Sequence, residues 1–207
     1  MKLHTNKVAP NPRKVAMFLA EKGIQIESVE IDLAGNENYS DAFKAKNELA
    51  RVPVLELDDG RFLAESVAIC RYFEEQQPNP PLLGGDAEDR AFVEMWTRRM
   101  ENEVMLNITG CFRHLHPYWA DRITQVEAYG ELCRANIDER MVWLDGVLAD
   151  RPFIAGARFT LADITAVAAF DLGKVAKVRI PEALGNLTRW YTEMNARDSV
   201  ASTRPGR

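Results

Sequence analysis

Apolar and polar residues follow two different periods along this chain, and the change of period divides the sequence into two parts. In the first 76 residues, short stretches that alternate apolar and polar positions, such as 24–33, are separated by stretches with a helical spacing, such as 13–22. Alternation predicts half-buried strands, whereas apolar residues three and four positions apart predict amphipathic helices. Beyond residue 86 the helical spacing continues without alternation. The pattern therefore predicts an α/β domain followed by an all-α domain.

The strand and helix signals of the first part occur in the order β-α-β-α-β-β-α. We predict that Asn11 is the N-cap of the first helix, with Pro12 at its first position, and that Gly23 ends this helix. Pro53 marks a strand start, because a proline cannot donate to a strand ladder. Asp58-Asp59-Gly60 predicts a tight hairpin turn. Two helix crossovers predict parallel pairing, and the hairpin adds an antiparallel edge.

Prolines and glycines interrupt the chain after this first part, where no helix or strand interior would tolerate them. We place the linker at residues 79–85, the α/β domain at 1–78 and the all-helical domain at 86–207. Two apolar stripes predict two long helices in the second domain. Thr160 and Asp163 predict a capping box at the start of a further helix, which we assign to stability rather than to chemistry.

The composition limits the classes of protein to which this chain can belong. Its 207 residues carry a net charge of −5 with both signs interspersed, which argues against a nucleic-acid partner. No apolar run approaches the ~20 residues of a membrane span, and three cysteines cannot close a disulfide framework. We therefore expect a cytoplasmic protein without a membrane partner. Its histidines and cysteines show no metal-ligand spacing and no glycine-rich phosphate loop follows a strand, so we expect neither a metal nor a bound cofactor.

Residues 51–66 combine a strand start with a helix start, and together these could hold a small peptide. The bond between Val52 and Pro53 is a candidate for the cis isomer, which would leave the amide and carbonyl of Val52 free to pair with an extended ligand. Glu65 and Ser66 begin the next helix, where unpaired backbone N–H groups and the Ser66 hydroxyl would favour an anion. The ordered combination is more specific than either element alone.

Six stretches of this sequence match a known pattern: 10–15, 18–23, 51–55, 63–69, 153–156 and 159–164. With them, the chain resembles the cytosolic glutathione transferase family along essentially its whole length. The resemblance implies a thioredoxin-like N-terminal domain, a helical C-terminal domain and usually a homodimer. It also implies that glutathione, as a co-substrate, lies along the sheet edge.

The resemblance assigns the parts of glutathione to particular residues of this chain. Val52 would pair with the cysteinyl backbone beside a cis Pro53, while Glu65 and Ser66 would hold the γ-glutamyl end. A carboxylate side chain suits the ammonium group of that end, and a helix start suits its carboxylate. The candidates for the glycyl carboxylate share a cationic or amide side chain: Arg51, Asn38 and Arg13.

The sequence departs from the family at the group that activates the thiol. The resemblance implies a Tyr near the end of the first strand or a Ser or Cys in the following loop, but these positions hold Thr5 and Ala9. Three sources of a hydrogen-bond donor remain open. They are the Thr5 hydroxyl, the Asn11 amide, and a water held by His116, which a fungal and bacterial subgroup with a similar N-terminus suggests. We prefer His116.

The function that follows is the addition of the glutathione thiolate to a small hydrophobic electrophile. We expect apolar groups of the helical domain near Phe112, Tyr118 and Trp119 to line the electrophile site. Glutathione-dependent reduction of disulfides or peroxides is an alternative, because the same thiolate can attack sulfur or oxygen. A non-catalytic interaction module is a second alternative, since the usual activating residues are absent and one fold can serve unrelated functions.

Overall fold

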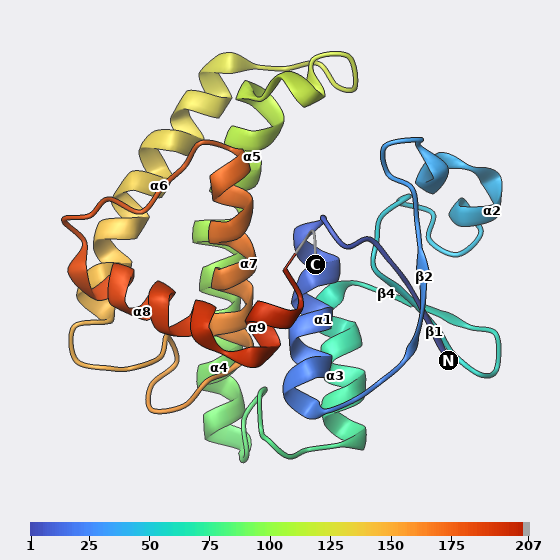
Figure 1. Ribbon diagram of the computed structural model, residues 1–207, viewed down its shortest axis with the longest axis horizontal. Coiled ribbons are helices and arrows are strands. Elements are labelled where there is room, and N and C mark those ends of the chain that lie inside the picture. The colour runs from blue at the N-terminus through green and yellow to red at the C-terminus, as the bar shows by residue number, and fades with distance from the viewer. Residues whose placement is uncertain (205–207) are drawn as a thin grey trace. The chain divides into compact units, whose positions relative to one another are not determined.

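The computed structural model describes residues 1–204, which form two compact units (Figure 1). The sheet unit comprises Met1–Leu82 together with the segment that begins at Asp198, and the helical unit comprises Leu83–Arg197. Residues 198–204 fall within the range 86–207 that we expected for the helical domain, but their contacts assign them to the sheet unit.

The sheet unit is built on a mixed four-stranded sheet. Its strands are β1 (Lys2–Thr5), β2 (Glu27–Glu30), β3 (Val54–Glu56) and β4 (Phe62–Ala64). The spatial order is β2-β1-β3-β4, with β1 and β2 parallel and the other pairs antiparallel. The antiparallel hairpin and the parallel pairing across the first crossover are therefore confirmed. The parallel pairing predicted for the second crossover is wrong, because β3 runs antiparallel to β1.

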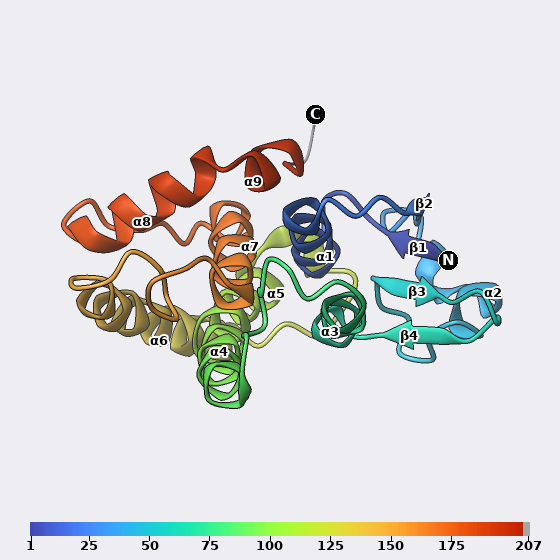
Figure 2. The same ribbon diagram turned by 90° about the horizontal axis from the view of Figure 1, so that it is seen from below.

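Helices cover both faces of this sheet. The helices α1 (Pro10–Lys22) and α3 (Ser66–Gln76) pack against each other on one face, and the short α2 (Asp41–Lys44) lies on the other (Figure 2). The 3-10 turn η1 (Glu37–Tyr39) precedes α2. On the α2 face, the buried core consists of Ile31, Phe43 and Val54. The element order confirms the prediction β-α-β-α-β-β-α.

The start of α1 differs from the prediction that Asn11 is its N-cap. The helix begins at Pro10, its N-cap is Ala9, and no side chain caps it. Asn6 explains the difference, because its Oδ1 accepts hydrogen bonds from the amides of Val8 and Ala9, each at 3.0 Å, and so directs the chain into the helix. Pro10 then takes the first helical position, which suits its fixed φ.

The helical unit contains the two long helices that the apolar stripes predicted. The first comprises α4 (Ala87–Arg99), a π-helical turn η2 (Met100–Met105) and α5 (Leu106–Leu115). The second is α6 (Glu127–Val147). Three further elements complete the unit: η3 (Pro117–Trp119), α7 (Leu161–Val175) and α8 (Gly185–Ala196). Among the described helices, none combines the length and the apolar character needed to cross a membrane.

The capping box predicted at Thr160 and Asp163 is present at the start of α7 and extends further than its sequence motif. The carboxylate of Asp163 accepts from the amide and hydroxyl of Thr160, at 3.0 and 3.2 Å. It also accepts from the amide of Ile154 and from Nε1 of Trp190, both at 2.9 Å. Complete burial raises the pKa of Asp163 to about 6, against the lowering effect of these four donors. The carboxylate therefore ties α7 to a loop and to α8.

The last described element, α9 (Asp198–Ser202), packs on α1 within the sheet unit. Arg13, which is buried, donates from Nη2 to the carbonyl of Val200 at 3.3 Å and from Nε to the carbonyl of Thr203 at 3.2 Å. The Ser199 hydroxyl donates to the carboxylate of Glu21. These bonds attach the C-terminal segment to the first helix of the chain.

Candidate functional site

The β3–β4 hairpin brings the two halves of the predicted peptide site to the same end of the sheet. Val54 pairs with Ala64 in the antiparallel register. Val52 precedes that pair on one strand and Glu65 follows it on the other, so both lie beyond the paired end of the hairpin. The tight turn predicted at Asp58-Asp59-Gly60 sets this register, and Gly60 has a φ of 83° there.

The main chain of Val52 is open for pairing. The bond between Val52 and Pro53 is cis, as the resemblance implied, and the ladder between β3 and β1 begins at Val54, opposite His4. Within residues 1–204, no hydrogen bond uses the amide or carbonyl of Val52. Its side chain packs against the core of the α2 face, which fixes the position of these two groups. An extended peptide could therefore add to the sheet at this residue.

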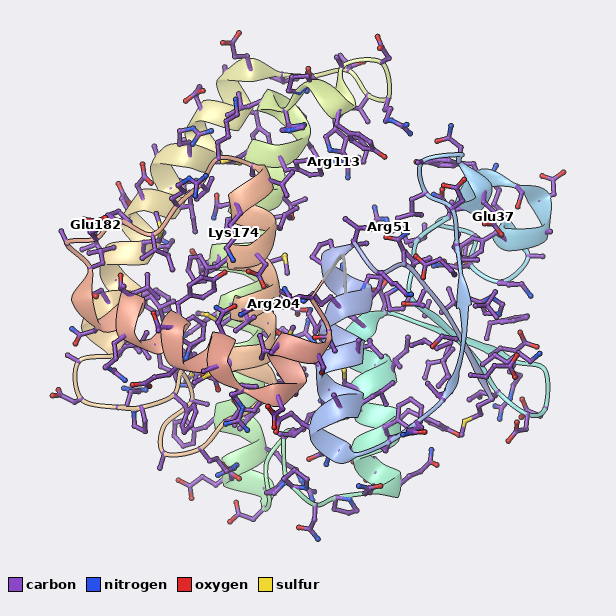
Figure 3. The ribbon with its side chains drawn as sticks, in the orientation of Figure 1. Glu37, Arg51, Arg113, Lys174, Glu182 and Arg204 are labelled. Atoms are coloured by element: carbon purple, nitrogen blue, oxygen red, sulfur yellow. The ribbon has the colours of Figure 1, made fainter. Side chains whose placement is uncertain are left out.

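The loop before β3 is held by two buried asparagines. Asn38 donates from Nδ2 to the carbonyl of Ala50 at 2.8 Å, and Asn47 donates from Nδ2 to the carbonyl of Arg51 at 2.8 Å. The Arg51 side chain extends from this loop (Figure 3); it is exposed and makes no ion pair with the described residues. Asn38 thus supports the loop, whereas Arg51 is available to a ligand.

The start of α3 has the properties of an anion site. Ser66 is 6% exposed, and its hydroxyl has no hydrogen-bond partner among residues 1–204. The first intrahelical bond runs from the Ile69 amide to the Glu65 carbonyl at 2.9 Å, so the amides of the preceding turn are unused by the helix. No side chain caps this helix. Its N-terminus therefore presents N–H groups, a hydroxyl and the positive end of the helix dipole.

Glu65 adopts a backbone conformation that is rare for its residue type. Its φ is 70° and its ψ is 118°, and its side chain is exposed. A non-glycine residue in such a region costs on the order of 1–3 kcal/mol, and residues of this kind cluster at ligand sites. Glu65 therefore combines a strained backbone and an exposed carboxylate at the end of the hairpin where Val52 is open.

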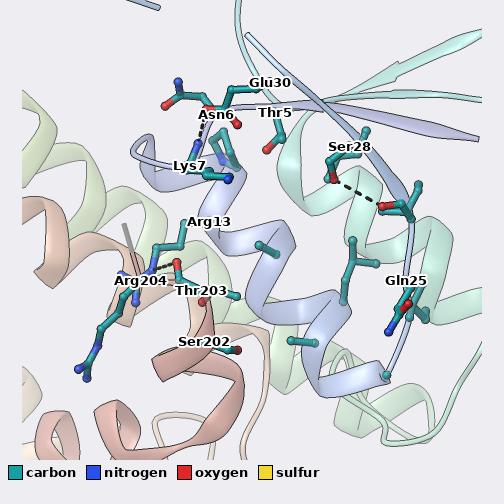
Figure 4. Close-up of a pocket in the computed structure, with 18 residues that line it drawn as sticks. Thr5, Asn6, Lys7, Arg13, Gln25, Ser28, Glu30, Ser202, Thr203 and Arg204 are labelled. Carbon is teal, nitrogen blue, oxygen red and sulfur yellow. Dashed lines mark hydrogen bonds between the residues drawn. The ribbon is translucent and has the colours of Figure 1, made fainter. Parts of the chain in front are cut away.

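Arg13 and Thr5 line a different pocket of the sheet unit. It has a volume of about 790 Å³ and lies between α1, β2 and Ser202–Arg204 (Figure 4). Its lining includes neither Val52 nor Glu65 nor Ser66. Since the Arg13 guanidinium already donates to two carbonyls of the C-terminal segment, the structure does not group it with the hairpin end.

Asn11 is exposed at the second position of α1. Its neighbours Pro10 and Pro12 have no N–H, and the first intrahelical amide is that of Arg13, which bonds to the Ala9 carbonyl at 3.2 Å. Asn11 is thus the residue that presents both a backbone N–H and a side-chain amide at this helix start. Without the cap role that we predicted for it, its side chain is free to serve a ligand.

His116 follows the last residue of α5 and caps η3. Its Nδ1 accepts from the amide of Tyr118 at 3.2 Å, and its ring lies 5.2 Å from that of Phe112. An Nδ1 that accepts a hydrogen bond places the proton of the neutral ring on Nε2. Because Nδ1 is occupied by the Tyr118 amide, Nε2–H remains able to donate a hydrogen bond to a water.

The three residues predicted to line the electrophile site form one aromatic cluster. The rings of Phe112 and Tyr118 are stacked at 6.1 Å, and Trp119 meets both edge-on, at 5.8 Å from Phe112 and 5.3 Å from Tyr118. Tyr118 is 42% exposed. The cluster therefore offers a partly open aromatic surface beside His116.

Arg113 is a residue of this cluster that sequence reasoning missed. Its guanidinium lies 5.0 Å from the centre of the Trp119 ring, and that of Arg122 lies 4.5 Å from the centre of the Tyr118 ring. The sequence places a cationic side chain next to the predicted electrophile site, because Arg113 directly follows Phe112. Residues 1–204 contain no group of three or more His, Cys, Asp or Glu side chains that could hold a metal.

A mixed four-stranded sheet whose third strand follows a cis proline, joined to an all-helical unit, is a thioredoxin-like domain followed by a helical domain. Residues 3–81 match the family described as glutathione S-transferase, N-terminal domain, and residues 106–198 match glutathione S-transferase, C-terminal domain. The chain is 33% identical over 204 residues to glutathione S-transferase 2 of Saccharomyces cerevisiae, covering 97% of this chain and 88% of that protein.

Solved structures of similar proteins have the same fold as this chain. The crystal structure of Gtt2 from Saccharomyces cerevisiae matches with a TM-score of 0.93 at 32% identity, covering 98% of this chain and 100% of that one. A glutathione S-transferase domain-containing protein of Marinobacter aquaeolei matches with a TM-score of 0.90 at 37% identity, covering 97% and 100%. The chain therefore belongs to the glutathione S-transferase family and is a glutathione transferase.

Proposed function

We propose that this enzyme conjugates the thiolate of glutathione to small hydrophobic electrophiles. The observation that carries the proposal is the hairpin end, where the open main chain of Val52 meets the uncapped helix start at Ser66. An extended peptide with an anionic end fits these two features. Val52 pairs with the cysteinyl backbone, Ser66 and the α3 amides bind the γ-glutamyl carboxylate, and Glu65 accepts from the γ-glutamyl ammonium.

The glycyl carboxylate is the part of glutathione with several candidate partners. Arg51 is the one we retain, because it is exposed and unpaired within the described chain. Asn38 acts through the loop that it supports, whereas Arg13 holds the C-terminal segment and lies away from the hairpin end.

The nucleophile comes from glutathione rather than from the protein. All three cysteines, Cys70, Cys111 and Cys133, are buried thiols, and burial raises the pKa of the Cys111 thiol to about 11. A thiol of pKa ~8.5 is only a few per cent ionised at neutral pH, and lowering it by ~2 units takes ~2.7 kcal/mol. One hydrogen bond to a charged group contributes ~1.5–3 kcal/mol, so a single donor is sufficient.

Three donors are proposed to stabilise the glutathione thiolate: a water on Nε2 of His116, the Asn11 amide at the α1 start, and the Thr5 hydroxyl. To rank them, the thiolate absorbance of bound glutathione is titrated against pH in His116→Ala and Asn11→Ala side by side. We expect His116→Ala to raise the midpoint more, with little change in glutathione affinity. A larger shift in Asn11→Ala would assign the thiolate to the helix start, and two unmoved midpoints would leave Thr5 or backbone amides.

In the conjugation step, the thiol gives its proton to solvent through the activating group. The sulfur then forms a bond to the electrophilic carbon, and for an aryl halide the halide leaves with the electron pair of the broken bond. Phe112, Tyr118 and Trp119 hold the electrophile. We propose a cytoplasmic detoxification role for this reaction.

The test of the proposed function is capture on immobilised glutathione followed by conjugation of 1-chloro-2,4-dinitrobenzene. We expect specific elution by free glutathione and turnover above the uncatalysed rate. Capture without conjugation, together with turnover of a disulfide or peroxide, would favour the reductase alternative. Absence of both binding and turnover would favour a non-catalytic interaction module.

We also propose that the enzyme is a homodimer. Phe92 on α4 and Leu106 at the start of α5 are 50% and 56% exposed. Large apolar side chains on one helical stretch suit a protein interface. Light scattering should give twice the chain mass of 23.4 kDa; a mass of one chain at micromolar concentration would contradict the proposal.

A further inference from the structure

The aromatic cluster includes an arginine, Arg113, that forms no ion pair with residues 1–204. Between Glu103 and Glu127 the sequence contains one acidic residue, Asp121, and two arginines, Arg113 and Arg122. This local excess contrasts with the net charge of −5 for the whole chain. Both arginines lie over rings of the cluster, so their charge is directed to the surface formed by Phe112, Tyr118 and Trp119.

Arg113 has no competing structural task in the described structure. No carboxylate within residues 1–204 forms an ion pair with its guanidinium, and the contact it makes is the one with the Trp119 ring. A basic residue in the last helical turn can complement the carbonyls of a helix end. Here Gln125 performs that task, because its Nε2 donates to the carbonyls of Arg113 and His116 at 2.9 and 3.0 Å.

The contact with the ring keeps the guanidinium available. The Trp119 ring occupies none of the N–H groups of Arg113 as a hydrogen-bond acceptor, so these groups can donate to a planar anion in a bidentate arrangement. The buried Nε1 of Trp119 has no hydrogen-bond partner in the described chain. The contacts of the indole are therefore those with the rings of Phe112 and Tyr118 and with the Arg113 guanidinium. A flat aromatic ligand with an anionic substituent complements both the rings and the charge.

We propose that Arg113 selects electrophiles in which a planar aromatic ring carries a carboxylate or another anionic group. This inference rests on the proposed function, because it assumes that the aromatic cluster lines the electrophile site. In the reaction of such an aryl chloride, the thiolate sulfur bonds to the ring carbon, chloride leaves with the bonding pair, and the carboxylate stays unchanged on Arg113. Arg113 thereby acts as a specificity residue.

The experiment compares 4-chloro-3,5-dinitrobenzoate with its methyl ester, which removes the negative charge. The enzymes are the wild type, Arg113→Met, Arg113→Lys and the control Arg99→Met. Arg99 is matched, since its guanidinium also lies over an indole ring, at 4.7 Å from Trp96 in the same helical unit. Circular dichroism and thermal melting confirm that each variant is folded.

We expect Arg113→Met to lower kcat/KM for the benzoate by roughly 5- to 20-fold, between the effect of an exposed ion pair and that of a charged hydrogen bond. The ester should change by less than about twofold, and Arg99→Met should leave both substrates unchanged. Arg113→Lys should retain part of the preference. High salt should reduce the preference of the wild type, because it screens exposed charges.

Three results would overturn the inference. Equal losses of kcat/KM for benzoate and ester in Arg113→Met would make Arg113 a packing residue. Wild-type kcat/KM for both substrates in that variant would show that its charge is unused. A raised KM for glutathione with both electrophiles would assign Arg113 to the glycyl carboxylate instead.

A binding measurement separates failure of the inference from failure of the proposed function. Tryptophan fluorescence reports the dissociation constants of 3,5-dinitrobenzoate and its methyl ester, which lack the leaving group. If the wild type conjugates the ester but Arg113→Met binds both analogues as the wild type does, the inference alone fails. If the wild type conjugates neither chloride, the proposed function fails, and the same titration still decides whether Arg113 selects the anion.

Discussion

The start of α7 is closed by its own chain, whereas the start of α3 is open. At α7, Asp163 is fully buried and accepts from four donors, two of which come from Ile154 and Trp190. At α3, no side chain caps the helix, the Ser66 hydroxyl has no partner in the described chain, and Glu65 is held at a φ of 70°. Both sites are helix N-termini with the same intrinsic need for acceptors. The difference teaches that unmet hydrogen-bonding capacity, rather than the helix start itself, distinguishes a ligand site from a structural joint.

The largest expected effect is a loss of stability when the closed start of α7 is disrupted. Asp163→Ala leaves the Ile154 amide, the Thr160 amide and Trp190 Nε1 without an acceptor in a buried region. We expect the free energy of unfolding at pH 7 to fall by about 3–5 kcal/mol, since each buried unsatisfied donor costs ~1–3 kcal/mol. The Michaelis constant for glutathione of the folded fraction should not change. Urea denaturation measures the unfolding free energy, and steady-state kinetics on the same sample measure the Michaelis constant. A loss of activity at unchanged stability would show that the α7 start serves function rather than structure.

The pH dependence of stability tests the same carboxyl. Its pKa is raised from 3.8 to about 6 in the folded state, so the folded protein holds this proton more tightly than the unfolded chain does. The contribution of Asp163 to stability is therefore greatest below pH 4 and falls as the pH rises to 6, by up to about 3 kcal/mol. The difference in unfolding free energy between the wild type and Asp163→Ala, measured from pH 4.5 to 7, should shrink. A difference that grows with pH would mean that the four donors outweigh burial.

At the open helix start the expected effect is on binding. Ser66→Ala should weaken glutathione binding by about 1–2 kcal/mol, or roughly 5- to 30-fold in Kd, through the loss of a hydrogen bond to a carboxylate. Stability should change little, because the hydroxyl has no partner within residues 1–204. Calorimetry measures the affinity, and Ser28→Ala, which removes an exposed serine of β2, is the control. Unchanged affinity in Ser66→Ala would remove the γ-glutamyl group from this helix start.

The smallest expected effect is on the stability of the α3 start, where Glu65 has a strained backbone. Glycine adopts a φ of 70° without strain, so Glu65→Gly should raise the free energy of unfolding by about 1 kcal/mol, after the entropy cost of glycine is subtracted. Glutathione affinity should fall in the same variant. Glu65→Gln keeps the strained backbone and removes the charge, so it should lose affinity without gaining stability. A loss of stability in Glu65→Gly would show that the conformation is not strained.

The sequence predicted the features that depend on local patterns. The α/β and all-α parts, the element order, the hairpin and the capping box were all visible from periodicity and turn residues, and the structure confirms them. The tight turn sets the hairpin register, which places Val52 and Glu65 at the same end of the hairpin.

The sequence did not predict features that depend on distant partners. Pro10 and Pro12 are equally good first residues of a helix, and the hydrogen bonds of Asn6 decide between them. Nothing in the amphipathic pattern shows which unit α9 joins, so the task of Arg13 was hidden. Likewise, the contact between Arg113 and the Trp119 ring depends on how the chain turns after α5.

The return of the C-terminal segment to α1 has a consequence for biosynthesis. The sheet unit begins at Met1 but includes α9, which ends at Ser202. A ribosome must therefore synthesise the whole helical unit before Arg13 can bond to the carbonyls of Val200 and Thr203. The sheet unit starts to be translated before the helical unit but is completed after it, and until then its α1 surface remains available to chaperones.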